Sequence, residues 1–179
     1  MVDIEKTLTR LHELGADKVD HLNGDLAAHL KGTFDVLARW GNPEHVCLAG
    51  LYHAVYGTDG LEIGVVGLEQ RALIAESIGK KAEELVYIYA ATDRLFFNQQ
   101  IAESDRPLHR DRFTGLESTL SPSLLKGFCE LTLANEIEIT INDPDHLRKY
   151  AFVFERLFDS NRFRSNLSKK ALGEYLSMR

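Results

Sequence analysis

Histidine is the side chain in this sequence best suited to chemistry near neutral pH, because its imidazole can exchange a proton or bind a divalent metal ion in that range. The chain has seven histidines. Four of them lie around one sequence break, "RWGNPEH", residues 39–45: His21 and His29 precede it, His45 ends it and His53 follows it. Whether two of them can share an ion depends on how the flanking segments fold.

The break itself predicts a tight turn between two helices. Gly41 suits the position after a helix, where φ is positive, Asn42 is a good N-cap and Pro43 is favoured at the first helical position. His29 lies 12.5 residues before the centre of this turn and His53 lies 11.5 residues after it. Since both helices rise by about 1.5 Å per residue, an antiparallel hairpin places the two imidazoles at nearly the same level.

The same geometry excludes pairs on one helix. His21 and His29 are eight residues apart, as are His45 and His53. Eight residues correspond to a rise of about 12 Å and a rotation of about 80°, so neither pair can share an ion directly. His45 is therefore expected at the surface or as a cap. His21 is expected two turns beyond His29, facing whatever binds beside the loop after the second helix.

The elements that must position these residues are helices, because apolar residues recur at helical spacing along most of the chain. We predict an all-α fold, a single compact domain spanning 1–179. Residues 103–121 are expected to form a loop or a lid, in which His109, Arg110 and Arg112 either close over an anionic ligand or are solvated. Helices are expected at 3–14, 18–40, 43–57, 66–78, 80–102, 122–141, 144–160 and 167–177.

Composition excludes several classes of function. The net charge of −6, with scattered basic residues, argues against binding to nucleic acid. Cys47 and Cys129 lie in apolar helical segments, which favours buried reduced thiols and a cytoplasmic location. Charges among the first residues argue against a signal peptide or a membrane span. The aromatic stretch "YAFVFERLFDSNRF" fits either the core or a homodimer surface.

Three segments together resemble the HD-domain superfamily of helical metalloproteins: "HLKGTFDVLARWG", "HVCLAGLYHAVYGT" and "RALIAESIGKKAEELVYIYAATDR". They cover roughly residues 20 to 95. In that superfamily a first His, a His-Asp pair on the next helix and a distant Asp hold one or two metal ions. The resemblance implies an HD-like fold and matches His29 to the first His, His53 to the His of the pair and Asp93 to the distant Asp.

The sequence departs from the family where Ala54 stands in place of the Asp that follows the second His, so it resembles a branch in which that Asp is replaced. A two-metal site then lacks a ligand. His29, His53 and Asp93 would still form a two-histidine, one-carboxylate set for a single iron, manganese or zinc ion. Alternatively, Asp93 belongs only to the polar end of a helix.

Two function classes follow. The first is a mononuclear metal-dependent hydrolase or oxygenase acting on a small polar or anionic metabolite, with His21 as acid/base or substrate contact. The second is a metal-free, vestigial HD-like domain that binds a small molecule or a protein. Glu69 and Arg71 are candidate substrate-binding residues or part of a solvated helix face, and Asn135 and Glu136 face the site or are satisfied core polar groups.

Overall fold

The computed structural model describes residues 3–21, 24–61, 64–104, 106–141 and 165–177. Most of these residues are helical, as the apolar periodicity predicts, and short antiparallel strand pairs join the helices. The helices are α1 (Ile4–Glu13), α2 (Leu26–Arg39), α3 (Glu44–Tyr52), α4 (Arg71–Ile78), α5 (Lys80–Ala91), α6 (Arg94–Glu103), α7 (Pro122–Ile141) and α9 (Asn166–Leu176), with 3-10 turns at Ala16–Lys18 and Leu68–Gln70. The strands are β1 (Asp20–His21), β2 (Gly24–Asp25), β3 (Leu108–Arg110) and β4 (Glu117–Thr119).

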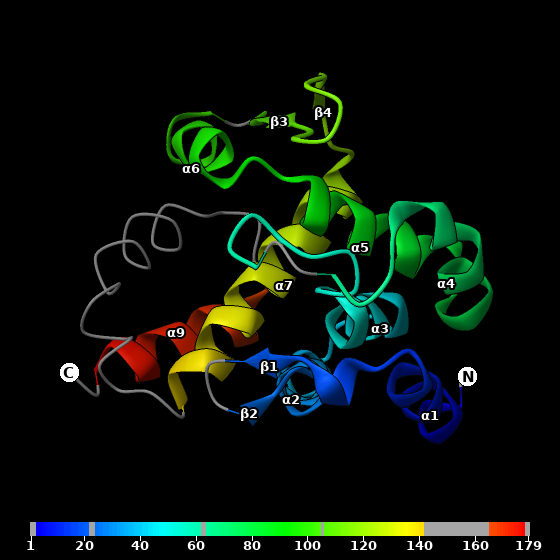
Figure 1. Cartoon of the computed structure of the whole chain (residues 1–179). Coiled ribbons are helices and arrows are strands. Elements are labelled where there is room, and N and C mark those ends of the chain that lie inside the picture. The colour runs from blue at the N-terminus through cyan, green and yellow to red at the C-terminus, as the bar shows by residue number, and fades with distance from the viewer. Residues whose placement is uncertain (1–2, 22–23, 62–63, 105, 142–164, 178–179) are drawn as a thin grey trace.

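Helix α7 runs through the middle of the molecule, and α2, α3, α5 and α9 pack against it (Figure 1). Helix α6 and the β3–β4 pair lie at the opposite end of the molecule from α1 and α2. Apolar side chains fill the contacts between the central helices: Leu30, Leu51, Leu85 and Leu131 are completely or almost completely buried. The core therefore lies between α7 and the α2–α3 hairpin.

The predicted turn between α2 and α3 is confirmed. Gly41 has a φ of 70°, a conformation that glycine adopts at little cost. One detail differs, because Pro43 is the N-cap of α3 and Asn42 instead donates its side-chain N–H to Leu37 O at 3.3 Å. The two helices approach closely at Gly50, where an added Cβ would lie 2.5 Å from Leu37 Cδ1.

Several predicted helices are shorter than the periodicity indicated: the helix predicted at 43–57 ends at Tyr52, and the one predicted at 66–78 begins at Arg71. Asp20–His21 and Gly24–Asp25 form the β1–β2 pair rather than the start of a helix, and α2 begins only after Asp25, whose side chain accepts a hydrogen bond from Ala28 N at 2.8 Å. The helix predicted at 80–102 is broken after Ala91, because Asp93 caps a new helix by accepting from Phe96 N at 3.0 Å. Local side-chain caps decide the boundaries at Asp25 and Asp93.

The segment predicted as a loop, 103–121, contains the β3–β4 pair. His109 on β3 is 1% exposed, and its Nε2 lies 3.0 Å from Thr92 Oγ1. Arg110 forms an ion pair with Glu117 across the two strands at 2.8 Å, and Arg112 donates to Ala90 O at 2.7 Å. These contacts hold in place the three side chains that we expected either to close over an anionic ligand or to be solvated.

A buried carboxylate attaches α9 to the core. Glu130 of α7 is fully buried and accepts hydrogen bonds from Ser168 Oγ at 2.7 Å, from Ser165 Oγ at 3.2 Å and from Asn42 Nδ2 at 3.1 Å. It also accepts from the backbone N–H of Ser165. One side chain thus joins the α2–α3 turn to the beginning of α9. The helix predicted at 144–160, with the aromatic stretch, lies outside the described residues.

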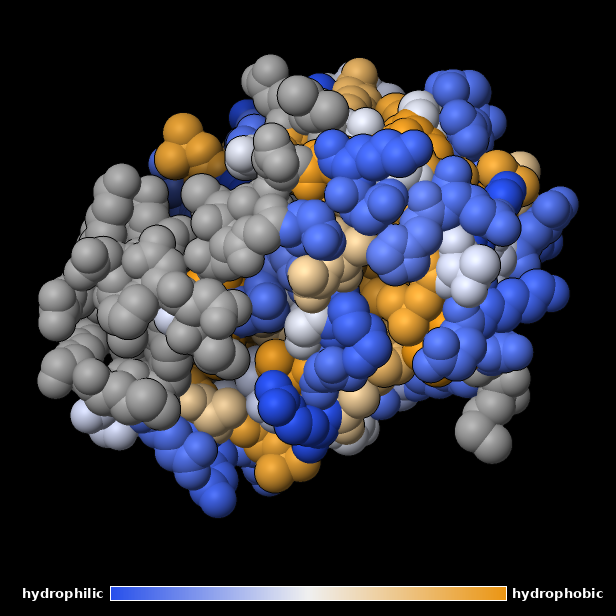
Figure 2. All heavy atoms as spheres, turned by 60° about the horizontal axis from the view of Figure 1, so that its bottom comes forward, coloured by the Kyte–Doolittle hydropathy of each residue, from blue (hydrophilic) through white to orange (hydrophobic). Residues whose placement is uncertain are grey.

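The surface is mixed in character. The face in Figure 2 is largely hydrophilic, with smaller hydrophobic areas between the polar side chains. Scattered exposed apolar side chains are ordinary in folded proteins. Among the described residues, the large hydrophobic side chains that are exposed are Leu95, Phe113, Leu116 and Leu167. No helix in this part of the chain is both long enough and apolar enough to span a membrane.

Candidate functional site

The hairpin brings His29 and His53 into contact, as their positions around the turn predict. Their Nε2 atoms are 3.3 Å apart, and the rings meet at 78°. Both side chains are buried, with His29 4% and His53 2% exposed. Helix α3 ends at Tyr52, so His53 is its C-cap and projects from the end of the helix toward α2.

The other ring nitrogen of each histidine faces an acceptor. His29 Nδ1 contacts the carboxylate of Glu138 on α7, and His53 Nδ1 lies 2.8 Å from Gly50 O. An acceptor at Nδ1 holds the ring proton there, which leaves the lone pair on Nε2. The two lone pairs then point toward each other across the hairpin.

A third acceptor lies beside the Nε2 atom of His29. Asn135 Oδ1, from α7, lies 3.0 Å from His29 Nε2, and Asn135 Nδ2 donates to Glu136 Oε1 at 3.1 Å. The bond to Glu136 orients the amide so that its oxygen, and not its nitrogen, faces His29. Imidazole nitrogens and an amide oxygen in this arrangement form a donor set that a cation, either a metal ion or a proton, can bind. We call the side chains of His29, His53, Asn135 and Glu138 the histidine site.

The spacing of the histidine site suits a metal ion. Two nitrogens bound to a tetrahedral zinc ion at about 2.0–2.1 Å are about 3.3–3.4 Å apart, which matches the separation of His29 Nε2 and His53 Nε2. The carboxylate of Glu138 on His29 Nδ1 is the partner that metal-bound histidines usually have. Within the described residues, however, no group of three His, Cys, Asp or Glu side chains could hold an ion. The third donor here is the amide oxygen of Asn135.

Asp93, which the resemblance implies as a ligand, is placed elsewhere. One carboxylate oxygen accepts from Phe96 N as the cap of α6, and the other lies 3.5 Å from Arg110 Nη1. These interactions fit the alternative that Asp93 belongs to the polar end of a helix. His21 lies in β1 rather than on the helix that carries His29, and its side chain is outside the described part of the structure.

Arg71 is held by other side chains of the fold. Its guanidinium donates to Glu83 at 2.6 and 3.0 Å and lies over the Tyr87 ring, 3.7 Å from the centroid. Glu83 is buried and also accepts from Tyr56 Oη at 3.1 Å. These interactions link the beginning of α4 to α5. Glu69, the other candidate for substrate binding, is exposed at the 3-10 turn before α4.

A second group of polar side chains adjoins the histidine site. The Tyr89 ring packs edge-on against His53 at 5.2 Å between centroids, and Arg94 Cζ lies 4.7 Å from the centroid of Tyr89. Arg94 Nη1 is 3.9 Å from Glu136 Oε1, the oxygen that also holds Asn135. Burial raises the pKa of the Tyr89 phenol, which therefore stays protonated at neutral pH. A chain of contacts therefore links His53 through Tyr89, Arg94 and Glu136 to Asn135.

Sequence reasoning identified Asn135 as a residue that could face the site but missed Glu138 and Tyr89. The signal for Glu138 was available, because positions 135 and 138 are three residues apart and so share one face of the predicted helix. Tyr89 gave no such signal, since an aromatic residue in an apolar helix is ordinarily part of the core.

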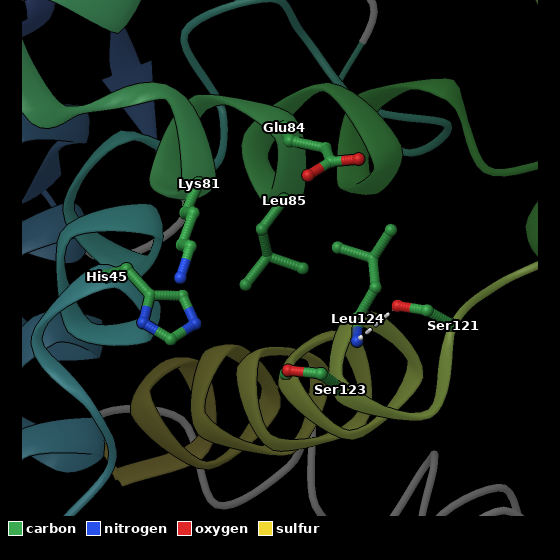
Figure 3. A pocket seen from close by; sticks show the side chains of 8 residues that line it. His45, Lys81, Glu84, Leu85, Ser121, Ser123 and Leu124 are labelled. Carbon is green, nitrogen blue, oxygen red and sulfur yellow. Dashed lines mark hydrogen bonds between the residues drawn. The ribbon is translucent and has the colours of Figure 1, made fainter.

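His45 belongs to a different cavity. It lies with Lys81 on the wall of a space of about 300 Å³ between α3, α5 and the beginning of α7 (Figure 3). Partial burial, and then the charge of Lys81, lowers the pKa of His45. This arrangement agrees with the expectation that His45 does not share a site with His53. The remaining lining residues are Glu84, Leu85, Ser121, Ser123, Leu124 and Gly127.

Comparison with known families gives one match. Residues 10–94 match the model of a family described as "Domain of unknown function (DUF6817)". No curated protein and no solved structure matches the chain. The matched segment includes His29, His53, Tyr89 and Arg94, and it ends before α7, which supplies Asn135 and Glu138.

Proposed function

We propose that this chain is a mononuclear metal-dependent enzyme, a hydrolase or an oxygenase, that acts on a small polar or anionic metabolite. His29 and His53 would hold the ion through Nε2, and Asn135 would contribute its amide oxygen. The observation that carries the proposal is the convergence of these acceptors, with 3.3 Å between the two nitrogens and 3.0 Å from His29 Nε2 to the amide oxygen. Iron, manganese and zinc are the candidate ions.

The resemblance to the HD-domain superfamily supports a single ion in an HD-like fold. The first His lies on α2 and the second caps the end of α3, and the two are in contact. Ala54, in place of the family's Asp, is buried and offers no donor, so a second ion would lack a ligand. The third ligand in this proposal comes from α7, because Asp93 caps α6.

The chain's own residues would orient the ligands. Glu138, at His29 Nδ1, would hold His29 in the tautomer whose Nε2 is the ligand atom, and Gly50 O, at His53 Nδ1, would fix the orientation of His53. Glu136 keeps the amide oxygen of Asn135 turned inward. A bound ion would supply a water of lowered pKa for hydrolysis or, if it is iron, a means of activating dioxygen.

A second candidate is a metal-free HD-like domain that binds a small molecule or a protein. A proton on His29 would also satisfy the geometry, because the resulting imidazolium would pair with Glu138 and donate from Nε2 to Asn135. The observation that favours this candidate is that, of the described His, Cys, Asp and Glu side chains, no three form a metal site.

Metal analysis separates the two candidates. The protein should be purified without chelator and its iron, manganese and zinc measured by mass spectrometry, followed by titration of the apoprotein with each ion. We expect about one ion per chain. His53→Ala should abolish binding because it removes one of two imidazole ligands. His45→Ala is the matched control, since it removes the histidine near the start of α3, which lines a different cavity.

Equal metal content in the His53→Ala and His45→Ala proteins would refute the metalloenzyme. The same conclusion would follow if the wild-type protein contained no metal and bound none of the three ions in the titration. A proton on His29 would then account for the histidine site, and the binding domain would become the better interpretation.

A further inference from the structure

Tyr89 and Arg94 carry two buried polar atoms that lack a hydrogen-bond partner. These atoms are Tyr89 Oη and Arg94 Nε, and they are the buried side-chain nitrogen or oxygen atoms without a partner among the residues that the structure describes. Nearly all buried polar atoms in folded proteins have a partner, which is either protein, water or a ligand. The two side chains also interact with each other, so one acceptor group beside them would supply a partner for both atoms.

The pair lies beside the histidine site. The Tyr89 ring contacts His53, and the Arg94 guanidinium lies over the Tyr89 ring. Tyr89 is fully buried, whereas the side chain of Arg94 as a whole is 27% exposed. Part of the Arg94 side chain thus reaches the surface, while its Nε atom is buried. The guanidinium lies beside the Tyr89 ring, which packs on His53.

The chemistry of the two atoms defines the missing group. Arginine N–H groups only donate, and a tyrosine hydroxyl in this position can donate as well. Glu136 Oε1 lies 3.9 Å from Arg94 Nη1, and Asp59 accepts from the Arg94 backbone N–H at 2.9 Å. The carboxylates of Glu136 and Asp59 therefore approach Nη1 and the backbone N–H of Arg94. The Nε–H group is the donor that still needs an acceptor. Guanidinium groups bind carboxylate and phosphate oxygens with charge-assisted hydrogen bonds.

We propose that Tyr89 and Arg94 bind an oxyanion of the substrate, a carboxylate or a phosphate, next to His53. This inference rests on the proposed function, because it assigns the anionic end of the metabolite to a place beside the histidine site. The oxyanion accepts one hydrogen bond from Tyr89 Oη and one from Arg94 Nε. The reacting part of the substrate then extends toward His53.

The test uses inorganic phosphate and acetate as probes at constant ionic strength, with chloride as the reference anion. Binding is followed by the NMR resonance of the Arg94 Nε–H in the full chain and by the dissociation constant from the titration. We expect one probe to shift this resonance saturably, which also distinguishes a phosphate from a carboxylate substrate. Tyr89→Phe and Arg94→Lys should each weaken binding by about tenfold or more, since each removes one donor.

Tyr87→Phe is the matched control. Its hydroxyl donates to Asp111 at 2.6 Å, away from the unpaired atoms, so this variant should bind the probe like the wild type. Unchanged probe binding in Tyr89→Phe, or no saturable shift with either probe, would overturn the inference and leave a buried water as the partner. Metal content is measured on the same samples, so that loss of metal with retained anion binding refutes only the proposed function.

Discussion

Replacing Gly32 by alanine should weaken the histidine site without unfolding the protein. Gly32 lies inside α2, three residues after His29. A Cβ at this position would lie 2.7 Å from both Cγ and Oε1 of Glu138, closer than such atoms can approach. Because these atoms belong to a flexible side chain, Glu138 should move away. Its carboxylate would then leave His29 Nδ1.

The expected magnitudes follow from two opposing effects. Alanine is better than glycine in the interior of a helix by about 0.5–1 kcal/mol. The displaced carboxylate loses a charge-assisted hydrogen bond, but Glu138 is 13% exposed and can reach water instead. The free energy of unfolding should therefore change by about 1 kcal/mol or less. Loss of the carboxylate partner of a metal-bound histidine should reduce metal affinity about 10–100-fold.

The assay is a competition titration of zinc between the protein and a chromophoric chelator, together with urea unfolding of the same samples. Gly173→Ala is the matched control, because Gly173 is also helical and an added Cβ there meets nothing within 4 Å. This control should gain helix propensity and keep its metal affinity. In a Glu138→Ala background, Gly32→Ala should have little further effect on affinity, since the two residues act through one contact.

Unchanged zinc affinity in Gly32→Ala would refute the reasoning. The reasoning would also be refuted if Gly32→Ala lowered zinc affinity by the same factor in the Glu138→Ala protein as in the wild type. In either case the glycine would not act by making room for the carboxylate.

Three further predictions concern the fold. Gly41→Val should destabilise the chain by about 1 kcal/mol or more through backbone strain at positive φ; an unchanged urea midpoint would count against it. Ser168→Ala removes a 2.7 Å hydrogen bond to buried Glu130 and should cost about 1–3 kcal/mol, with faster amide exchange in α9; normal protection there would contradict this. Burial lowers the pKa of His109, so its contribution to stability is present above about pH 6.5, where the unfolded chain is also neutral, and is lost as the pH falls below it. Urea midpoints at pH 7 and pH 5 should therefore differ less in His109→Gln than in the wild type, and an equal difference would argue against it.

Much of the secondary structure was predictable because its signals are local. The helix predicted at 122–141 has the bounds of α7, and the turn at Gly41 has the positive φ that its position requires. The errors fell where a cap outweighed apolar periodicity, as at Asp25 and Asp93. The β3–β4 pair was missed because it has only three residues in each strand, too few for an alternating pattern to be recognised.

The sequence by itself determined that the chain is mainly helical and that His29 meets His53. A short turn and an equal rise per residue fix the level of side chains on both helices of a hairpin. The tertiary structure alone decided the rest of the site. Asn135 and Glu138 reach His29 across 106 and 109 residues of sequence, and no local spacing encodes which helix packs against the hairpin. That choice depends on the fit of whole apolar faces, which also brought Tyr89 to His53.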